Sequence, residues 1–449
     1  MTAPSAKRTT TAIAGAMTLL ASSLAMLTAP AQAAEGDTTS RGVTIPAFYN
    51  PPTSLPAKNG TLVRAEPMKV ALTLPTPSGK LPGKATRVMF KSTDATNKPV
   101  AVTGAYLEPE KKWTGKGKRP LVVLGAGTQG QGDQCAPSIG LERPIGIDLK
   151  NENMSAGYEV LAAYRLLDKG VAVMVSDYVG LGATDRAHTY MTRLDQAHAL
   201  NDAARAALSL PGTSISKDSK IGFYGYSQGG GASGAAAELQ PTYAPELNLA
   251  GAYVGAPPAD LVKTIDGIDG SALAVALAWT INGLIQYNPE LGYKLDVYMN
   301  QKGKDLLADS VDRCVGDGLI KYAFTKTSSL TKDGSSLAQI LKKEPQMKAI
   351  VDAQRIGKIK PKVPVRVATG TVDDSVPHGQ ARQLAVDWCK AKANVTYVPV
   401  VLPNLGDKLV LTNHFLPLII DQGAAIDWLT DRLNGKRASS NCWSMPLQP

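Results

Sequence analysis

The chain has 449 residues, of which 44% are hydrophobic, and this is enough to bury a large core. Its formal net charge is +10, but the basic residues are scattered and form no patch interleaved with aromatic side chains, which argues against nucleic-acid binding. Only four histidines and four cysteines occur, with no C-x-x-C pair, so we expect no metal and no cofactor.

The N-terminal residues 1–33 have the features of an export signal. Lys7 and Arg8 give a positive start, residues 12–27 form an apolar stretch, and residues 31–33 read A-x-A, the cleavage signature. The apolar stretch is short for a membrane anchor, so we expect its removal and a secreted, extracellular protein. In an oxidising compartment the four cysteines would form two disulfides, and the sequence alone leaves three pairings open.

The next part of the chain predicts an α/β core. Residues 34–61 read as an extended arm, and residues 85–91 and 100–107 as an antiparallel pair of strands. Continuous apolar strands that alternate with helices are typical of a mostly parallel sheet covered on both faces. The strands are expected at residues 121–124, 171–175, 221–224 and 249–254, and the helices at residues 156–167 and 194–208.

The pattern changes at residue 257, where a helical insertion is expected to begin. We assign residues 34–256 to the first part of the core, 257–360 to a helical cap, and 361–449 to the second part of the core. The apolar segment 271–287 inside the cap is either a lid that meets lipid or a buried cap helix. The core resumes with strands at residues 363–368 and 395–401 and ends with a helix at residues 416–433.

A G-x-S-x-G motif at residues 225–229 follows the strand at 221–224 and precedes a run of small residues. This order predicts a sharp turn from strand to helix that exposes the hydroxyl of Ser227, so Ser227 is the candidate nucleophile. Its flanking glycines are expected because a Cβ there would collide with the neighbouring strand or helix. The alternative is a glycine-rich turn between strand and helix whose serine has no catalytic role.

A serine nucleophile needs a base, and the base needs an orienting acid. Asp373 follows the strand at 363–368, and His414 follows the strand at 395–401, which gives the order Ser, Asp, His at the carboxyl edge of the sheet. We predict His414 as the base and Asp373 as the acid, with Asp374 as the alternative. The other histidines, His188, His198 and His378, are given no catalytic role.

The oxyanion hole is expected to use the backbone N–H of Gln228, the residue after the nucleophile. The second N–H is expected from the glycine-rich loop at residues 125–130, through Thr128 or Gln129. The sequence does not decide between these two residues.

The chain resembles the secretory lipases of the α/β-hydrolase class, the group that contains the fungal lipase A enzymes and many actinobacterial relatives. The resemblance covers nearly the whole mature chain. Beside the serine motif, Asp373 and His414, it is carried by residues 48–52, 134–138, 176–182, 243–247 and 374–377.

This resemblance implies an α/β-hydrolase fold with an inserted cap and a triad of Ser227, Asp373 and His414. It also implies a disulfide from Cys135 to Cys314, and we infer the second from Cys389 to Cys442. The chain departs from the fungal members after the third core strand: they carry an aspartate near the oxyanion hole, whereas residues 128–130 here are Thr, Gln and Gly.

The sequence therefore predicts a secreted carboxylic-ester hydrolase, a lipase or esterase that resembles a triacylglycerol lipase. The alternatives are an acyltransferase with the same triad and a catalytically silent extracellular binding protein on a hydrolase scaffold. The expected partner is a small-molecule or lipid ester, with transient contact to a lipid interface. We expect a monomer.

Overall fold

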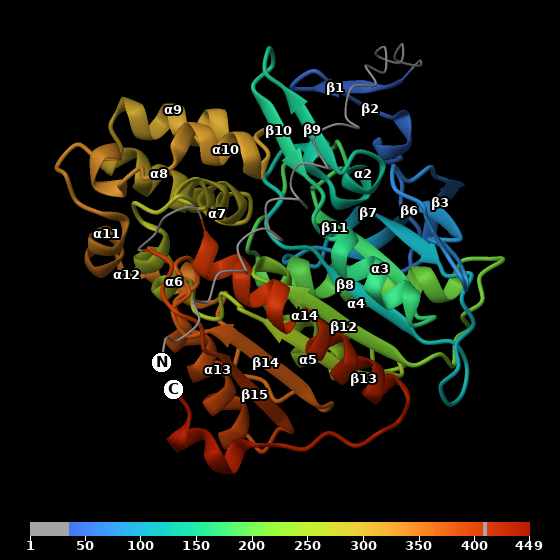
Figure 1. Cartoon of the computed structure of the whole chain (residues 1–449). Coiled ribbons are helices and arrows are strands. Elements are labelled where there is room, and N and C mark those ends of the chain that lie inside the picture. Colours follow the sequence, from blue (N-terminus) through green and yellow to red (C-terminus); the bar gives the residue numbers. More distant parts are fainter. Residues whose placement is uncertain (1–35, 407–410) are drawn as a thin grey trace, which may run out of the picture.

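A large mixed sheet forms the centre of the protein (Figure 1). The computed structural model describes residues 36–406 and 411–449, so the predicted signal peptide at residues 1–33 lies outside the described residues. Within them the strand order is β15-β14-β13-β12-β8-β11-β7-β6-β3. The strands are β3 (Leu62–Pro67), β6 (Lys84–Thr93), β7 (Pro99–Glu108), β8 (Leu121–Gly125), β11 (Ala172–Val179), β12 (Ile221–Tyr226), β13 (Leu249–Gly255), β14 (Val365–Gly370) and β15 (Val395–Val400).

The strands β11, β8, β12, β13, β14 and β15 run parallel to one another, and β7, β6 and β3 extend the sheet with antiparallel pairing. Alternate residues of a strand point to opposite faces, and β8 shows the result: Leu121 and Val123 enter one hydrophobic core, whereas Val122 and Leu124 enter the other. Because both faces are buried, these strands are apolar throughout, and the predicted α/β sheet is confirmed.

Helices cover both faces of the sheet (Figure 1). One core takes side chains from α4 (Arg193–Ser209), α5 (Gln228–Tyr243) and α13 (His378–Lys390). The other takes them from α3 (Val160–Asp168) and α14 (Thr412–Leu433). A short helix, α2 (Pro137–Glu142), packs against the end of the sheet near β7 and β11.

Between β13 and β14 the chain is helical, as the break at residue 257 predicts. These helices lie together on one side of the molecule and share a hydrophobic core (Figure 1). Tyr190, Met191 and Leu411 of the sheet domain join that core, so the insertion packs directly on the sheet domain. The helices are α6 (Leu261–Ile268), α7 (Val275–Ile285), α8 (Pro289–Tyr298), α9 (Gln301–Ser310), α10 (Val315–Tyr322), α11 (Leu337–Lys343) and α12 (Pro345–Asp352).

The apolar segment 271–287 contains α7, and Leu277, Trp279 and Leu284 on this helix are buried. The helix thus lies in the interior of the cap, which favours the second of the two interpretations of this segment. Because its apolar side chains already contact protein, α7 has no exposed apolar face to present to lipid.

Three features of the fold differ from the sequence-based expectations. The expected helix at 156–167 begins at Val160, because residues 153–156 form β10 (Asn153–Ala156), which pairs with β9 (Ile145–Asp148). The last helix begins at Thr412 rather than 416, so Pro417 lies inside the helix rather than in its first turn, and its missing N–H removes one helical hydrogen bond. The N-terminal arm contains a short hairpin rather than only extended chain, β1 (Thr38–Ser40) with β2 (Val43–Ile45), and a second hairpin, β4 (Leu74–Thr76) with β5 (Gly79–Leu81), follows after the arm.

The structure contains two disulfides, Cys135–Cys314 and Cys389–Cys442, and these are the two pairs inferred with the family resemblance. No helix in residues 36–406 and 411–449 is both long and apolar enough to cross a membrane.

Candidate active site

Ser227 lies at the turn between β12 and α5, with φ 58° and ψ −124°. This left-handed conformation is costly for a residue with a Cβ, and such strain is typical of functional positions. The turn is tight enough that a Cβ on Gly225 would lie 2.1 Å from the carbonyl oxygen of Gly229. The glycines of the motif therefore permit the turn, and the turn places Ser227 at the N-terminus of α5.

His414 and Asp373 form a buried pair. His414 Nδ1 lies 2.8 Å from Asp373 Oδ2, and the two side chains are 2% and 0% exposed. The other carboxylate oxygen, Oδ1, accepts hydrogen bonds from the backbone N–H groups of Ser375 (2.9 Å) and Val376 (2.8 Å). Because the carboxylate accepts the Nδ1 proton, Nε2 of the neutral imidazole is left free to take a proton from elsewhere.

Asp374, the alternative acid, contacts the backbone before the histidine rather than its ring. Its Oδ2 accepts the backbone N–H of Asn413 at 3.2 Å, and its Oδ1 lies 3.4 Å from the Ser375 hydroxyl. His414 lies in the first turn of α14, not before the helix as the sequence suggested, and Asp374 holds that turn in place.

Ser227 and His414 line the same cavity, together with Thr128, Tyr226 and Phe415. The hydroxyl of Tyr226 donates to the backbone carbonyl of His414 at 2.7 Å, which links the turn of the serine to the turn of the histidine. The Ser227 hydroxyl makes no hydrogen bond to His414 within the described part of the chain. Such bonds often form only when substrate is bound, so the shared cavity is the relevant geometry.

The electrostatics around His414 suit a general base. Burial lowers the pKa of His414, but the charge of Asp373, its hydrogen bond and the charge of Asp374 raise it, and the net effect is a pKa above 6.5. The imidazolium that would form during proton transfer is therefore stabilised by a carboxylate in direct contact.

The glycine-rich loop after β8 also lines the cavities beside Ser227. Thr128 lines two cavities that contain Ser227, and Gln129 lines neither of these two. The carbonyl of Gln129 instead accepts the backbone N–H of Val315, from the cap, at 2.7 Å. Gln228 is the first residue of α5, where backbone N–H groups are free to bind an anion. Of the two loop candidates, the geometry thus favours Thr128.

Residues that carried no signal in the sequence hold this loop. Glu159 is buried, accepts the backbone N–H of Gly127 at 2.6 Å, and has a pKa raised by burial to about 7. The Tyr158 hydroxyl donates to the carbonyl of Thr128 at 2.9 Å. They lie 30 or more residues from the loop, so only the fold brings them to it.

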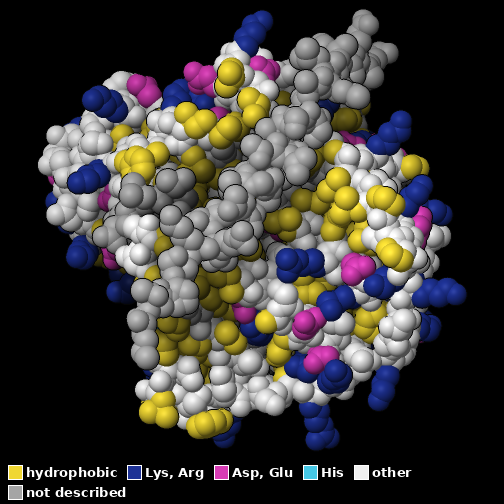
Figure 2. Space-filling model, viewed as in Figure 1, with side chains coloured by type: hydrophobic (Ala, Val, Ile, Leu, Met, Phe, Trp, Pro, Cys, Tyr) yellow, Lys and Arg dark blue, Asp and Glu magenta, His cyan; other side chains and the backbone are white. Residues whose placement is uncertain are grey.

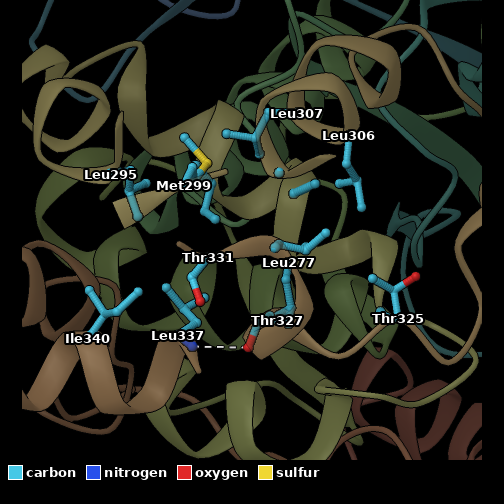
Figure 3. Close-up of a pocket in the computed structure, with 15 residues that line it drawn as sticks. Leu277, Leu295, Met299, Leu306, Leu307, Thr325, Thr327, Thr331, Leu337 and Ile340 are labelled. Carbon is cyan, nitrogen blue, oxygen red and sulfur yellow. Dashed lines mark hydrogen bonds between the residues drawn. The ribbon is translucent and has the colours of Figure 1, made fainter. Parts of the chain in front are cut away.

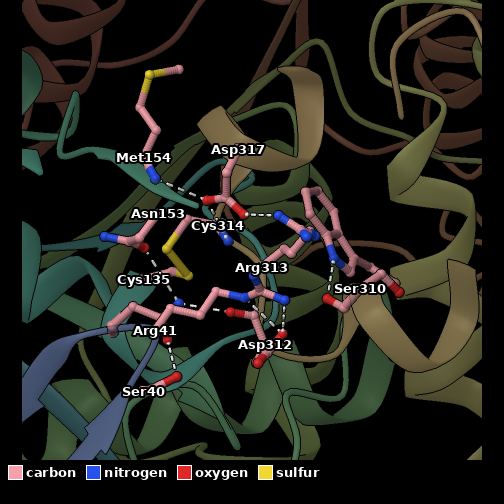
Figure 4. The surroundings of a disulfide bond; sticks show 12 residues. Ser40, Arg41, Cys135, Asn153, Met154, Ser310, Asp312, Arg313, Cys314 and Asp317 are labelled. Atoms are coloured by element: carbon pink, nitrogen blue, oxygen red, sulfur yellow. Dashed lines mark hydrogen bonds and ion pairs between the residues drawn. A yellow bond between two sulfur atoms is a disulfide. The ribbon is translucent and has the colours of Figure 1, made fainter. Parts of the chain in front are cut away.

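The cap also binds the loop, through the segment that contains Cys314 (Figure 4). Residues 129–132 pair with residues 313–315 by backbone hydrogen bonds, from Gln131 N to Arg313 O (2.9 Å) and from Val315 N to Gln129 O (2.7 Å). The Cys135–Cys314 disulfide closes this contact. The Arg313 side chain, 1% exposed, forms ion pairs with Asp317 at 3.2 Å and Glu152 at 2.7 Å, which fixes the cap segment.

A largely apolar pocket lies deeper in the cap (Figure 3). Side chains of α7, α8, α9 and α11 line it, and Leu277 lines both this pocket and a cavity that contains Ser227. The labelled residues in Figure 3 are apolar apart from three threonines, and Thr327 Oγ1 accepts the backbone N–H of Leu337 at 3.0 Å. An apolar chain attached at Ser227 would find apolar surroundings on this side.

Comparisons with known proteins agree with this arrangement. The model of the family described as "Secretory lipase" matches residues 146–441. The chain is 27% identical to a secreted triacylglycerol lipase of Malassezia restricta over 397 residues, which are 87% of this chain and 79% of that protein. It is 26% identical to a protein of Mycobacterium tuberculosis described as a "Probable inactive lipase", over 87% of this chain and 82% of the relative.

Among solved structures, the chain is similar to Candida antarctica lipase A, with a TM-score of 0.72 and 20% identity. The match covers 88% of this chain and 87% of that one. At this level of identity the likeness shows a shared fold.

Proposed function

Because the chain belongs to the secretory lipase family and is a secreted carboxylic-ester hydrolase, we propose that it cleaves esters through a triad of Ser227, His414 and Asp373. The observation that carries this proposal is the buried pair of His414 and Asp373, 2.8 Å apart, beside the cavity that contains Ser227. A strained serine at a helix N-terminus supports it independently.

In the proposed mechanism, Ser227 Oγ attacks the ester carbonyl carbon while His414 Nε2 takes the hydroxyl proton. The tetrahedral oxyanion is held by the backbone N–H groups of Gln228 and Thr128. The ester C–O bond then breaks, His414 gives its proton to the departing alcohol, and the acyl group remains on Ser227. Water attacks this acyl-enzyme by the same steps, and the acid is released.

The alternative of a silent binding protein has a counterpart among the relatives, since the mycobacterial one is described as inactive. Family membership alone therefore does not decide activity. The strained Ser227 and the His414–Asp373 hydrogen bond support activity for this chain, because a serine at a strained turn and a histidine oriented by a carboxylate are what nucleophilic catalysis requires.

The substrate we propose is an ester with a long acyl chain, as in a triacylglycerol. The acyl chain would pass Leu277 and enter the apolar pocket of Figure 3, because Leu277 lines both spaces. Burial of each methylene contributes about 0.8 kcal/mol, so a pocket of this kind favours long chains over short ones.

We also propose transient contact with a lipid surface. Several large apolar side chains on the β9–β10 hairpin, on α10 and just after α10 are exposed, and Figure 2 shows hydrophobic side chains on this side of the molecule. Exposed apolar groups of this size favour an apolar partner. They are Ile145, Ile147, Leu149, Ile320 and Phe324.

The proposal is tested with p-nitrophenyl esters from the four-carbon to the sixteen-carbon acyl chain, with the variant Ser227→Ala as the blank. We expect hydrolysis by the wild-type protein, a kcat/KM that rises with chain length, and a loss of kcat of about 10⁴-fold or more in the folded variant. Hydrolysis by Ser227→Ala at the wild-type rate would refute the triad. A preference for the four-carbon ester would refute only the long-chain substrate.

A further inference from the structure

We propose that His188, a histidine outside the triad, is a positioning residue that sets the geometry of both halves of the oxyanion hole. This inference rests on the proposed function, since it assigns His188 to the same site. The argument begins from the hydrogen bonds of its ring.

The ring of His188 is completely buried and has two partners. Nδ1 lies 2.9 Å from the backbone carbonyl of Val179, which can only accept, so Nδ1 carries the proton. In the neutral ring Nε2 is then an acceptor, and it lies 3.2 Å from Nε2 of Gln228. The side-chain amide of Gln228 therefore donates to His188.

This contact matters because Gln228 directly follows the nucleophile and its backbone N–H is the first donor of the proposed oxyanion hole. Gln228 is only 2% exposed, so its side chain is shielded from bulk water, and its amide nitrogen has His188 as a hydrogen-bond partner. By fixing the side chain, His188 fixes the rotation of the peptide whose N–H points to the oxyanion. A misdirected donor loses most of its hydrogen-bond energy.

The second half of the hole is reached through the two tyrosines that pack against the same ring. Tyr178 stacks on His188 with ring centroids 6.0 Å apart, and Tyr190 meets it edge-on at 5.9 Å. The Tyr178 hydroxyl donates to the carbonyl of Ala126 at 2.8 Å, and the Tyr190 hydroxyl lies 2.7 Å from Thr128 Oγ1. Both tyrosines thus hold the loop that supplies the second donor.

The charge state of His188 is consistent with this role. Burial lowers the pKa of His188 to about 4, so the ring is neutral and able to accept at the pH where His414 acts as a base. The titratable groups packed against the ring are the phenols of Tyr178 and Tyr190, whose pKa values burial raises, so they too are uncharged. His188 thus stays neutral in the working range, and the Val179 carbonyl sets its tautomer.

Two substitutions separate the partners of His188. Asparagine reaches only the position of Nδ1, so His188→Asn keeps a donor for Val179 and removes the acceptor for Gln228. Glutamine is long enough to put its carbonyl oxygen near the position of Nε2, so His188→Gln restores that acceptor. Gln228→Ala removes the side chain and keeps the backbone N–H.

We expect kcat to fall about 10-fold or more in folded His188→Asn and in Gln228→Ala, with KM within about 2-fold of wild type, because loss of a whole oxyanion donor costs about 10² to 10³. The double variant should lose no more than either single one, and His188→Gln should recover kcat to within about 3-fold. Thermal unfolding of each variant checks the fold.

His198 provides the matched control. It is also a buried histidine whose Nδ1 bonds a backbone carbonyl, that of Thr93 at 2.8 Å, and whose ring stacks on a tyrosine, Tyr243. It contacts neither half of the hole, so His198→Asn should leave kcat within about 2-fold.

A wild-type kcat in folded His188→Asn, or losses that multiply in the double variant, would overturn the inference. Where His188→Asn does not fold, Gln228→Ala decides: an unchanged kcat overturns the inference and a 10-fold loss supports it. The failure of the proposed function is a different result, because the wild-type protein itself would then hydrolyse no ester.

Discussion

At the residue scale, each candidate catalytic side chain follows a parallel strand of the central sheet: Ser227 follows β12, Asp373 follows β14 and His414 follows β15. The glycines around Ser227 are visible as a pattern, since the tight turn requires them, and Asp373 and His414 follow later strands in the expected order. Asp373 rather than Asp374 contacts the histidine ring, a choice that only the backbone conformation of their loop decides.

The residues around the oxyanion hole could not be predicted in the same way. Glu159 and His188 carry no motif, and Tyr178 belongs to the segment 176–182 but nothing in that segment indicates its contact with the loop. The partners Gly127, Gln228 and Ala126 lie 32 to 52 residues away in the sequence. A single hydrogen bond between segments far apart in the chain produces no periodic pattern in the sequence. For the same reason the sequence leaves the choice between Thr128 and Gln129 open.

The pH dependence of activity follows from the surroundings of His414. Its pKa is raised above 6.5 and the base must be neutral, so kcat should rise with pH through a pKa above 6.5 and be lost as pH falls. Asp373→Asn removes the charge and the hydrogen-bond acceptor that raise the pKa of His414. The acid limb of the pH profile, in which kcat falls as pH falls, should therefore move to lower pH, while the maximal kcat falls by about 10⁴-fold.

Asp374→Asn is the control for this profile, because Asp374 acts on the ring only through its charge. We expect a smaller shift of the acid limb and a loss of kcat below about 10-fold. An acid limb below pH 6 in the wild-type protein, or a larger loss in Asp374→Asn than in Asp373→Asn, would contradict the assigned roles.

At the scale of elements, the contact between the cap segment 313–315 and the loop 129–132 joins two parts of the chain that the sequence treats as separate domains. The Cys135–Cys314 disulfide spans 179 residues and lies at this contact, whereas Cys389–Cys442 spans 53 residues and ties α13 to the C-terminal segment. The chain therefore contains one disulfide next to the site and one remote from it.

Replacing each pair of cysteines by serine should separate stability from catalysis. Both double variants should lose about 2–5 kcal/mol of unfolding free energy, because both lose a cross-link of the unfolded chain. Only the variant without Cys135 and Cys314 should also lose kcat, by about 10-fold, because it frees the loop of the second oxyanion donor. Chemical denaturation and ester hydrolysis at a temperature where both variants are folded measure the two effects. Equal kcat in the two variants would show that the cap contact does not position the loop.

At the scale of the whole molecule, the parallel sheet and the helical insertion could be predicted because buried strands are continuously apolar and the pattern breaks at residue 257. The hairpin of β9 and β10 could not, because its strands are short and contain glycine, asparagine and serine. How the cap sits on the sheet depends on Tyr190, Met191 and Leu411, which join its core from two separate segments of the sheet domain.

The arrangement as a whole places one serine at the meeting point of sheet, cap and last helix, and the central claim is that this serine carries the acyl group. The most direct measurement is mass spectrometry of the secreted protein after reaction with a fluorophosphonate ester, followed by peptide mapping. The account predicts one adduct, on the peptide that contains Ser227, formed in parallel with the loss of esterase activity. An adduct on another residue, or full inactivation with Ser227 unmodified, would contradict it.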